Sequence, residues 1–528
     1  MREKVLKFLR QAVRENVKIE ITSPDEEKQG HYSTNVAFRL AQKRGGTPYQ
    51  EALTIAAAIK KAAPKNLFQK IEVAGPGFIN FWIAPEAWHE SLKEILRGKK
   101  NYGRVKAASK KKIQLEFVSA NPTGPLTLAN GRGGFLGDIL GNVLSAAGHK
   151  VEREYYVNDT GNQVLTLGKS MVAALKLIPK EEQFYKGEYI EAWANKNSVF
   201  VKKNAGQPIR VGQKAAGEFL KAIRLVLEKK ARIRFNRYTS EEKDVRKKGF
   251  VEKALRIFKR KKLTYEKEGA LWLKTTKFDD DKDRVIVKSN GDPTYILADS
   301  GHNLETKARR IDRKILILGP DHYGYVARMK AAASIIGLDL EILITQALRL
   351  VEGGREVKMS KRKGAFVTFE ELVSEVGADA ARFFFLMHAP ESHMDFDLGL
   401  AKERSNKNPV YYTQYAYVRA RNIAKKAKFK PTHKNLASLK TPQDIALLKQ
   451  LARFPEFVSD SAEDYRVHRL TRYAIELAKT FHNFYEKERV IGESNGILAD
   501  ARLSLVHGAL VVFENLLDIL GLTKPSKM

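Results

Sequence analysis

Ile113-Gln-Leu-Glu-Phe-Val118 is followed by Ser-Ala-Asn-Pro-Thr-Gly-Pro-Leu and then by Thr127-Leu-Ala-Asn-Gly-Arg-Gly-Gly-Phe-Leu-Gly-Asp138, and this stretch decides the fold. The first six residues are apolar and β-branched enough for a buried strand, which Asn-Pro-Thr-Gly-Pro ends abruptly. Apolar residues then recur at helical spacing from Phe135 to Leu144, and Asn130 is a suitable N-cap for that helix. The stretch therefore predicts a strand, a tight loop and a helix.

Four glycines, Gly131, Gly133, Gly134 and Gly137, lie at the start of this predicted helix. Each costs about 1 kcal/mol relative to alanine. A ligand that approaches the backbone too closely for a Cβ would offset that cost, and a helix N-terminus favours an anion. The alternative is a glycine-rich helix packed against a neighbouring element. A dinucleotide fingerprint is disfavoured because its third glycine would fall at Leu136.

Composition indicates a soluble protein of several domains. A length of 528 residues suggests about three or four domains. Ninety-four Lys and Arg residues exceed 61 Asp and Glu residues by 33, a charge that attracts polyanions, nucleic acid first and anionic membrane second. An unusually Lys-rich proteome is the alternative explanation. No run of about 18 uninterrupted apolar residues predicts a membrane span. Cysteine is absent, which fits a reducing cytoplasm and excludes thiolate metal sites.

The order of patterns along the chain predicts three domains. Residues 1–105 combine helical segments with a strand pair around 71–83 and are expected to form a small α+β unit. Residues 106–400 alternate strands and helices, which implies a parallel sheet with ligands at the carboxyl ends of its strands. The alternation lapses into basic helices over about 165–283, which we interpret as an insertion, and the strand pattern returns at 284–288. Residues 401–528 predict an α-helical bundle.

Two motifs give the chain a family resemblance. Ala120-Asn-Pro-Thr-Gly-Pro-Leu126 with Gly131-Arg-Gly133 resembles the first signature of arginyl-tRNA synthetase, a class I aminoacyl-tRNA synthetase. The family's His-x-Gly-His slot is replaced here by Thr127-Leu-Ala-Asn130. Lys358-Met-Ser-Lys361, bounded by glycines, resembles the second class I signature. The resemblance implies a Rossmann-like α/β catalytic domain with a helical insertion, an N-terminal appended domain that contacts tRNA, and a C-terminal anticodon-binding bundle.

Four residues match the family's arginine-binding pattern: Glu116, Asn121, Tyr295 and Asp299. A helix over 295–299 would place Tyr295 and Asp299 on one face. A guanidinium is a planar fork of five donors, and carboxylates hold it best. By resemblance the acids and the tyrosine hold the arginine side chain, Asn121 holds its backbone end, and His322 borders the pocket. The alternative is that Glu116 and Asp299 pair with this protein's own arginines.

The resemblance also assigns the residues that would act on ATP. Lys361 would face the leaving pyrophosphate, with Lys358 and Ser360 supporting the loop. Thr127 and Asn130 can donate hydrogen bonds but cannot become cations, so backbone N–H groups, Lys361 and a Mg²⁺ ion bound with the nucleotide would stabilise the phosphate. The remaining residues expected to bind ATP are Pro122, Gly131, Gly134, Asp321 and Met359. No side-chain metal site is predicted.

The segment 408–421 concentrates tyrosines and arginines on one predicted helix. Aromatic rings can stack on unpaired bases and arginines can bind phosphates, so we expect Tyr411, Tyr415 and Arg419 to contact tRNA. The alternative is that most of these tyrosines belong to the core. His31 and Tyr32 in the N-terminal unit are equally expected to contact tRNA or to pack within their own domain.

The resemblance as a whole implies a monomeric, cytoplasmic arginine–tRNA ligase. Its expected partners are L-arginine, ATP and tRNA(Arg), with no membrane. The alternative from another class is a catalytically silent RNA-binding paralogue that kept the fold. A cysteine or glutamine enzyme of the same class is disfavoured because the predicted pocket carries two acids.

Overall fold

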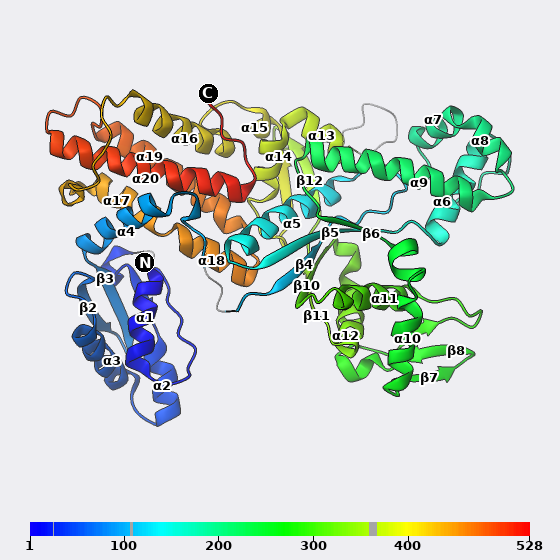
Figure 1. The fold of residues 1–528 in the computed structure, drawn as a ribbon, viewed down its shortest axis with the longest axis horizontal. Helices are drawn as coiled ribbons and strands as arrows, with labels where there is room; N and C mark the ends of the chain where they lie inside the picture. Colours follow the sequence, from blue (N-terminus) through cyan, green and yellow to red (C-terminus); the bar gives the residue numbers. More distant parts are fainter. Residues whose placement is uncertain (25, 106–108, 358–366) are drawn as a thin grey trace.

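A computed structural model describes residues 1–528 except 25, 106–108 and 358–366. Figure 1 shows the α+β N-terminal unit beside a helical bundle, with a central sheet between the bundle and a group of protruding helices. The predicted Lys358, Met359, Ser360 and Lys361 lie outside the described residues.

The N-terminal unit has the predicted α+β structure. Three strands form an antiparallel sheet in the order β1-β3-β2, and β2 and β3 form the expected strand pair, joined at Gly75-Pro-Gly77. Both glycines have positive φ, which the turn requires. The elements are α1 (Arg2–Val13), β1 (Tyr32–Thr34), α2 (Val36–Arg44), α3 (Pro48–Ala62), β2 (Phe68–Ala74), β3 (Phe78–Ile83) and α4 (Pro85–Gly98).

The central sheet has five parallel strands in the order β11-β10-β4-β5-β6. Its strands are β4 (Lys112–Glu116), β5 (Lys150–Val157), β6 (Arg237–Ser240), β10 (Arg313–Leu318) and β11 (Asp339–Ile344). Successive strands extend from β4 in one direction and from β10 in the other, so the order reverses between β4 and β10. In open α/β sheets, ligands bind in the crevice at this reversal, outside the carboxyl ends of the strands.

The predicted insertion is wrong in its second half. Strand β6 lies within the predicted 165–283 insertion but belongs to the central sheet, whereas β9 (Arg284–Val287) belongs to a separate antiparallel sheet with β7 (Thr264–Lys267) and β8 (Ala270–Leu273). The short, polar Arg237-Tyr-Thr-Ser240 lacks the apolar run that marks a buried parallel strand. The elements α6 (Asn162–Ala174), α7 (Glu188–Lys196), α8 (Ser198–Lys203) and α9 (Pro208–Leu225) do form a helical group with its own core.

The other elements complete the catalytic unit and the bundle. The catalytic unit adds α5 (Leu128–Ala146), α10 (Phe250–Arg260), α11 (Tyr295–Ala308), α12 (Val326–Ile336), β12 (Leu348–Glu352), β13 (Arg355–Glu356), α13 (Phe369–Val376), α14 (Ala378–Phe385), β14 (Met394–Asp397) and α15 (Leu398–Lys402). The bundle contains α16 (Pro409–Lys426), α17 (Pro442–Ala452), α18 (Phe454–Asp464), α19 (His468–Lys487) and α20 (Gly496–Leu520). Helix α20 is long and apolar enough to cross a membrane, but most of it is buried as the bundle's central helix.

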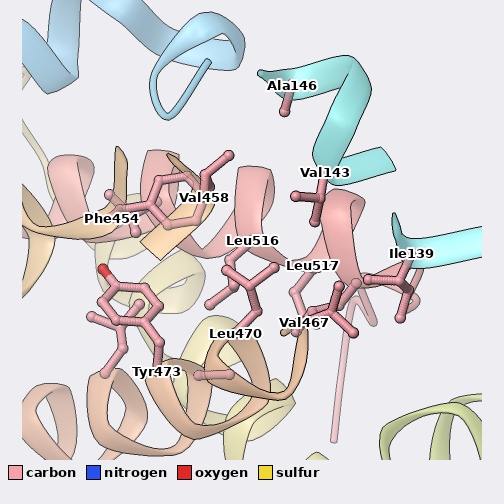
Figure 2. Close-up of a cluster of buried hydrophobic side chains, with 14 of the residues drawn as sticks. Ile139, Val143, Ala146, Phe454, Val458, Val467, Leu470, Tyr473, Leu516 and Leu517 are labelled. Atoms are coloured by element: carbon pink, nitrogen blue, oxygen red, sulfur yellow. The ribbon is translucent and has the colours of Figure 1, made fainter. Parts of the chain in front are cut away.

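Helix α5, which carries the first signature, packs its distal half against the bundle. Figure 2 shows Ile139, Val143 and Ala146 of α5 facing the apolar side chains of α18, α19 and α20. The Asn142 amide also donates to the Ile519 carbonyl at 2.9 Å. The bundle therefore fixes the helix whose first turn faces the site.

The N-terminal unit is tied to the same bundle. The Tyr32 hydroxyl is buried and donates to Glu456 of α18 at 2.6 Å, and the Arg2 guanidinium pairs with Asp460 one turn further. Tyr32 therefore packs between domains instead of only within its own.

Candidate active site

Strand β4 ends at Glu116, directly at the reversal of the sheet. The two residues of the following turn with positive φ are Val118 (66°) and Ser119 (37°). A β-branched residue at positive φ is rare and strained, and such strain concentrates at functional sites. The turn places the Ser119 hydroxyl between two residues: Ser119 Oγ donates to Glu116 Oε1 at 3.3 Å and accepts from the Tyr156 backbone N–H at 3.0 Å. The loop thus holds the Glu116 carboxylate from one side.

The other side of Glu116 has an unpredicted partner. Glu116 is 5% exposed, and its Oε2 lies 2.8 Å from the ammonium of Lys314, itself 2% exposed on the neighbouring strand β10. The sequence predicts a carboxylate that holds a bound arginine side chain or pairs with one of the protein's own arginines. The structure instead pairs Glu116 with the protein's own lysine, because parallel β4 and β10 bring both side chains to the same layer.

Tyr295 and Asp299 lie in the first turns of α11, as predicted. Tyr295 is 67% exposed. The pKa of Asp299 is raised to about 6, mainly by burial; the charges of Lys314 and His302 act to lower this pKa, and those of Glu116 and Glu241 act to raise it. The two predicted acids therefore share one electrostatic environment, although they come from separate halves of the sheet.

Tyr156 and Glu241 border this environment and are missing from the predicted set. The Tyr156 ring stacks on His302 of α11, with ring centroids 4.1 Å apart. Its hydroxyl is buried without a hydrogen-bond partner, and burial together with Glu241, Asp299 and Glu116 holds the pKa of Tyr156 well above its usual range. The position of β5 beside β4 could have indicated Tyr156, because carboxyl ends of neighbouring parallel strands meet at one edge.

The first signature ends in a helix cap that differs from the prediction. The N-cap of α5 is Thr127, three residues before the predicted Asn130. Thr127 Oγ1 accepts from the Asn130 N–H at 3.4 Å, and Asn130 Oδ1 accepts from the Thr127 N–H at 2.9 Å, which is a capping box. Both side chains therefore already serve the helix, and the Asn130 amide NH₂ and the N–H groups of Leu128 and Ala129 are left to face an anion.

This cap allows a direct test of stability. Replacing Thr127 with alanine is expected to lower the free energy of unfolding by about 1 kcal/mol, because the N-cap acceptor is lost. Thermal unfolding of the two variants Thr127→Ala and Thr127→Ser measures it, since serine keeps the acceptor. Equal losses in both variants would contradict the capping role.

Packing accounts for three glycines of α5, whereas the contact of Gly131 and Gly134 with ATP stays a prediction. A Cβ on Gly131 would lie 2.2 Å from the Phe369 ring, and one on Gly137 would lie 2.2 Å from the Phe117 ring. A Cβ on Gly134 would meet Ile233 at 2.9 Å. The alternative of a glycine-rich helix packed against its neighbours holds for these three positions.

The remaining predicted residues lie around the same edge. Asp321 and His322 follow β10 in a 3₁₀ turn, are mostly exposed and pair with each other at 3.3 Å. Asn121 and Pro122 lie in the loop between β4 and α5, where Pro122 is buried and Asn121 is half-buried.

The predicted tRNA-binding residues form a stack on α16. Tyr411 and Tyr415 are stacked with ring centroids 6.2 Å apart, and both are half-buried. The Arg419 guanidinium lies over the Tyr415 ring at 4.6 Å and donates to the Tyr415 hydroxyl at 2.9 Å. The neighbouring Tyr417 is buried in the core, in line with the alternative for part of this segment.

A basic pocket lies between α4 and the bundle. Its volume is about 800 Å³, and its polar lining consists of Lys93, Arg97, Lys99, Lys100, His433, His507 and Glu514. Such a lining suits a phosphate-bearing ligand.

Comparison with known proteins agrees with this arrangement. Family models match residues 1–83 (arginyl tRNA synthetase N terminal domain), 91–385 (tRNA synthetases class I (R), catalytic domain) and 413–528 (DALR anticodon binding domain). The arginine–tRNA ligase of Citrifermentans bemidjiense is 41% identical over 97% of this chain and 95% of its own. That of Caldanaerobacter subterraneus subsp. tengcongensis is 38% identical over 100% and 98%.

Solved structures show the same fold. The Thermus thermophilus arginyl-tRNA synthetase superimposes with a TM-score of 0.81 at 21% identity, covering 100% of both chains. The Plasmodium falciparum enzyme gives 0.77 at 16% identity, covering 100% of this chain and 99% of its own. With three family models in sequence and relatives of about 40% identity over nearly their whole length, the chain belongs to the arginyl-tRNA synthetases, the class I ligases that join arginine to tRNA.

Proposed function

We propose that this chain charges tRNA(Arg) at the edge of the sheet near Glu116 and Asp299. The observation that carries the proposal is the shared environment of these two carboxylates, because a desolvated acidic pair selects a guanidinium over a neutral side chain. Asn121 and the exposed Tyr295 lie at the same edge and would hold the amino-acid end and the side chain. His322 would border the pocket.

The reaction proceeds in two steps. The arginine carboxylate attacks the α-phosphate of ATP, which forms arginyl-adenylate and releases pyrophosphate. A ribose hydroxyl at the 3′ end of tRNA, by family analogy the 2′-OH, then attacks the arginyl carbonyl and releases AMP. We assign stabilisation of the attacked phosphate to the first N–H groups of α5 and to Lys361, with Lys358 and Ser360 supporting it. Pro122, Asp321 and Met359 would border the nucleotide.

We propose that Mg²⁺ arrives with ATP, held by the phosphates, where it neutralises the charge of the departing pyrophosphate. Within the described residues, one cluster, Glu116, Glu154 and His302, has the ligand spacing of a metal site. The Lys314 ammonium contacts Glu116 and His302 of that cluster, so the cluster does not fit a metal ion. We further propose a monomer acting in the cytoplasm without a membrane partner.

The tRNA partner is supported by the formal charge of +33, the stack of Tyr411, Tyr415 and Arg419, and the basic pocket beside α4. Aromatic stacking and phosphate contacts are the interactions that single-stranded loops offer.

Charging of tRNA(Arg) with labelled arginine tests the proposal. Wild-type protein should incorporate arginine well above Lys361→Ala and Asp299→Ala variants. Background incorporation by all three would support a silent RNA-binding paralogue instead. Pyrophosphate exchange with and without tRNA tests the family expectation that arginine activation needs bound tRNA.

The raised pKa of Asp299 predicts a pH dependence. Only the ionised carboxylate binds a guanidinium, so the affinity for arginine should fall about tenfold per pH unit below pH 6 and be constant above about pH 7. The free protein shows the opposite sign in stability: since the folded pKa lies above the unfolded value, ionisation of Asp299 lowers stability as pH rises through about 4 to 6. Arginine binding measured by calorimetry between pH 5 and 8 checks the slope, which should vanish in Asp299→Asn.

A further inference from the structure

A buried lysine lies directly behind the proposed arginine pocket. The Lys314 ammonium is 2.8 Å from Glu116 Oε2, 3.3 Å from His302 Nδ1 and 3.2 Å from Asn303 Oδ1. All four side chains are nearly inaccessible to solvent. The contacts with His302 and Asn303 have hydrogen-bond geometry, whereas the contact with Glu116 is an ion pair. Lys314 is therefore fixed in place and cannot serve as a mobile catalytic base.

The same contacts assign the state of His302. Because Lys314 can only donate, His302 Nδ1 must accept, which leaves the proton on Nε2. His302 Nε2 lies 2.7 Å from Glu154 Oε1, and Glu154 Oε2 in turn lies 2.6 Å from the Arg309 guanidinium. Burial opposes ionisation of Glu154, but the hydrogen bond from His302 and the nearby positive charges lower the pKa of Glu154 to about 2. Glu154 thus has Arg309 and Arg237 as its guanidinium partners, whereas the direct ion pair of Lys314 is with Glu116.

The charges around the pocket leave one negative charge for a guanidinium to neutralise. Glu116 and Asp299 contribute two negative charges, Lys314 contributes one positive charge, and the neighbouring Glu241 is already paired with Arg246 at 2.6 Å. One bound arginine side chain makes this desolvated group neutral, which is the arrangement that buried charges require. Without Lys314, two carboxylates would face a single guanidinium, and one of them would have to bind a proton and lose its value as an acceptor.

We infer that Lys314 is a positioning residue for arginine recognition, acting through Glu116. Its ammonium lies 2.8 Å from Oε2, and Ser119 donates to Oε1, so the Glu116 carboxylate is held in one orientation beside the pocket. This inference rests on the proposed function and adds the residue that sets the charge of its pocket.

The test compares the Michaelis constants of Lys314→Met, Lys314→Arg and Glu116→Gln in the charging reaction. Lys314→Met should raise KM for arginine by about 10- to 100-fold and leave KM for ATP and tRNA within about twofold, because only the arginine pocket loses its balance. Lys314→Arg keeps the charge and should recover most of the arginine affinity. Lys112→Met is the matched control: Lys112 is a half-buried lysine on adjacent β4 whose ammonium bonds the Arg309 carbonyl and no carboxylate.

The double variant Lys314→Met/Glu116→Gln completes a double-mutant cycle. It also covers the case in which Lys314→Met alone fails to fold. If Lys314 acts through Glu116, the double variant should have the same KM for arginine as Glu116→Gln. The inference would be overturned if the increases in KM for arginine of the two single variants added up in the double variant. It would also be overturned if Lys314→Met reduced the amount of active enzyme but left KM for arginine unchanged. An unchanged KM in Glu116→Gln would instead overturn the proposed role of Glu116, so the two failures are distinguishable.

Discussion

Replacing Asp299 with asparagine is expected to lower kcat/KM for arginine by about 10³-fold, since a desolvated charge pair is worth about 3–5 kcal/mol. Asparagine keeps the shape of the side chain but removes its charge and turns an NH₂ group toward a cation. The loss should appear in arginine binding, with KM for ATP and tRNA nearly unchanged. Steady-state kinetics with each substrate varied in turn measures it.

Asp292→Asn is the matched control for this experiment, because Asp292 is an exposed carboxylate in the turn before α11 and bonds Asn290. It should behave as wild type. A tenfold or smaller loss in Asp299→Asn, or the same loss in the control, would remove Asp299 from the arginine pocket.

Replacing Arg382 with methionine is expected to destabilise the protein by about 3–5 kcal/mol, because the buried carboxylate of Asp138 would lose its closest cation and keep only Arg153, 3.8 Å away, and the Arg234 N–H. Arg382 of α14 is almost fully buried and contacts Asp138 of α5 at 2.5 Å. It also donates to the carbonyls of Ala231 at 3.1 Å and Arg232 at 3.0 Å. One side chain thus joins the signature helix to the segment that leads to β6.

Urea unfolding followed by fluorescence measures this loss. The double variant Arg382→Met/Asp138→Asn should recover part of the stability, because the unpaired charge is gone. Arg349→Met is the control: Arg349 pairs with Asp395 at the surface, and its removal should cost no more than about 1 kcal/mol. Similar shifts in Arg382→Met and Arg349→Met would contradict the importance of the buried pair.

The parts of the fold with strong local patterns could be predicted from the sequence. Strand β4, helix α5, strand β5 and the bundle follow from apolar periodicity. The predicted N-cap of α5, Asn130, lies three residues after the actual N-cap, Thr127, because Leu128 and Ala129 do not extend the apolar repeat back to Thr127. Strand β6 was missed because its four residues are held in the sheet by β5 and carry no apolar run of their own.

The site could be predicted only where a motif marks it. Glu116 and Asp299 match the family's arginine-binding pattern, and the charge of Glu116 acts on Asp299 in the structure. Lys314 opens an apolar strand and has the appearance of an ordinary strand residue, and Tyr156 appears as one more aromatic in β5. Their importance arises from tertiary partners, since Lys314 meets Glu116 and His302 only after three distant segments assemble.

The packing of α5 against the bundle has a consequence during protein synthesis. About 310 residues separate the end of α5 from the start of α18, and Figure 2 shows side chains of both helices in one apolar cluster. At about 5–20 residues per second, the ribosome needs roughly 15–60 s to deliver the helices that cover this apolar face. The apolar face of α5 should therefore stay exposed, and able to bind chaperones, for most of the time that translation takes.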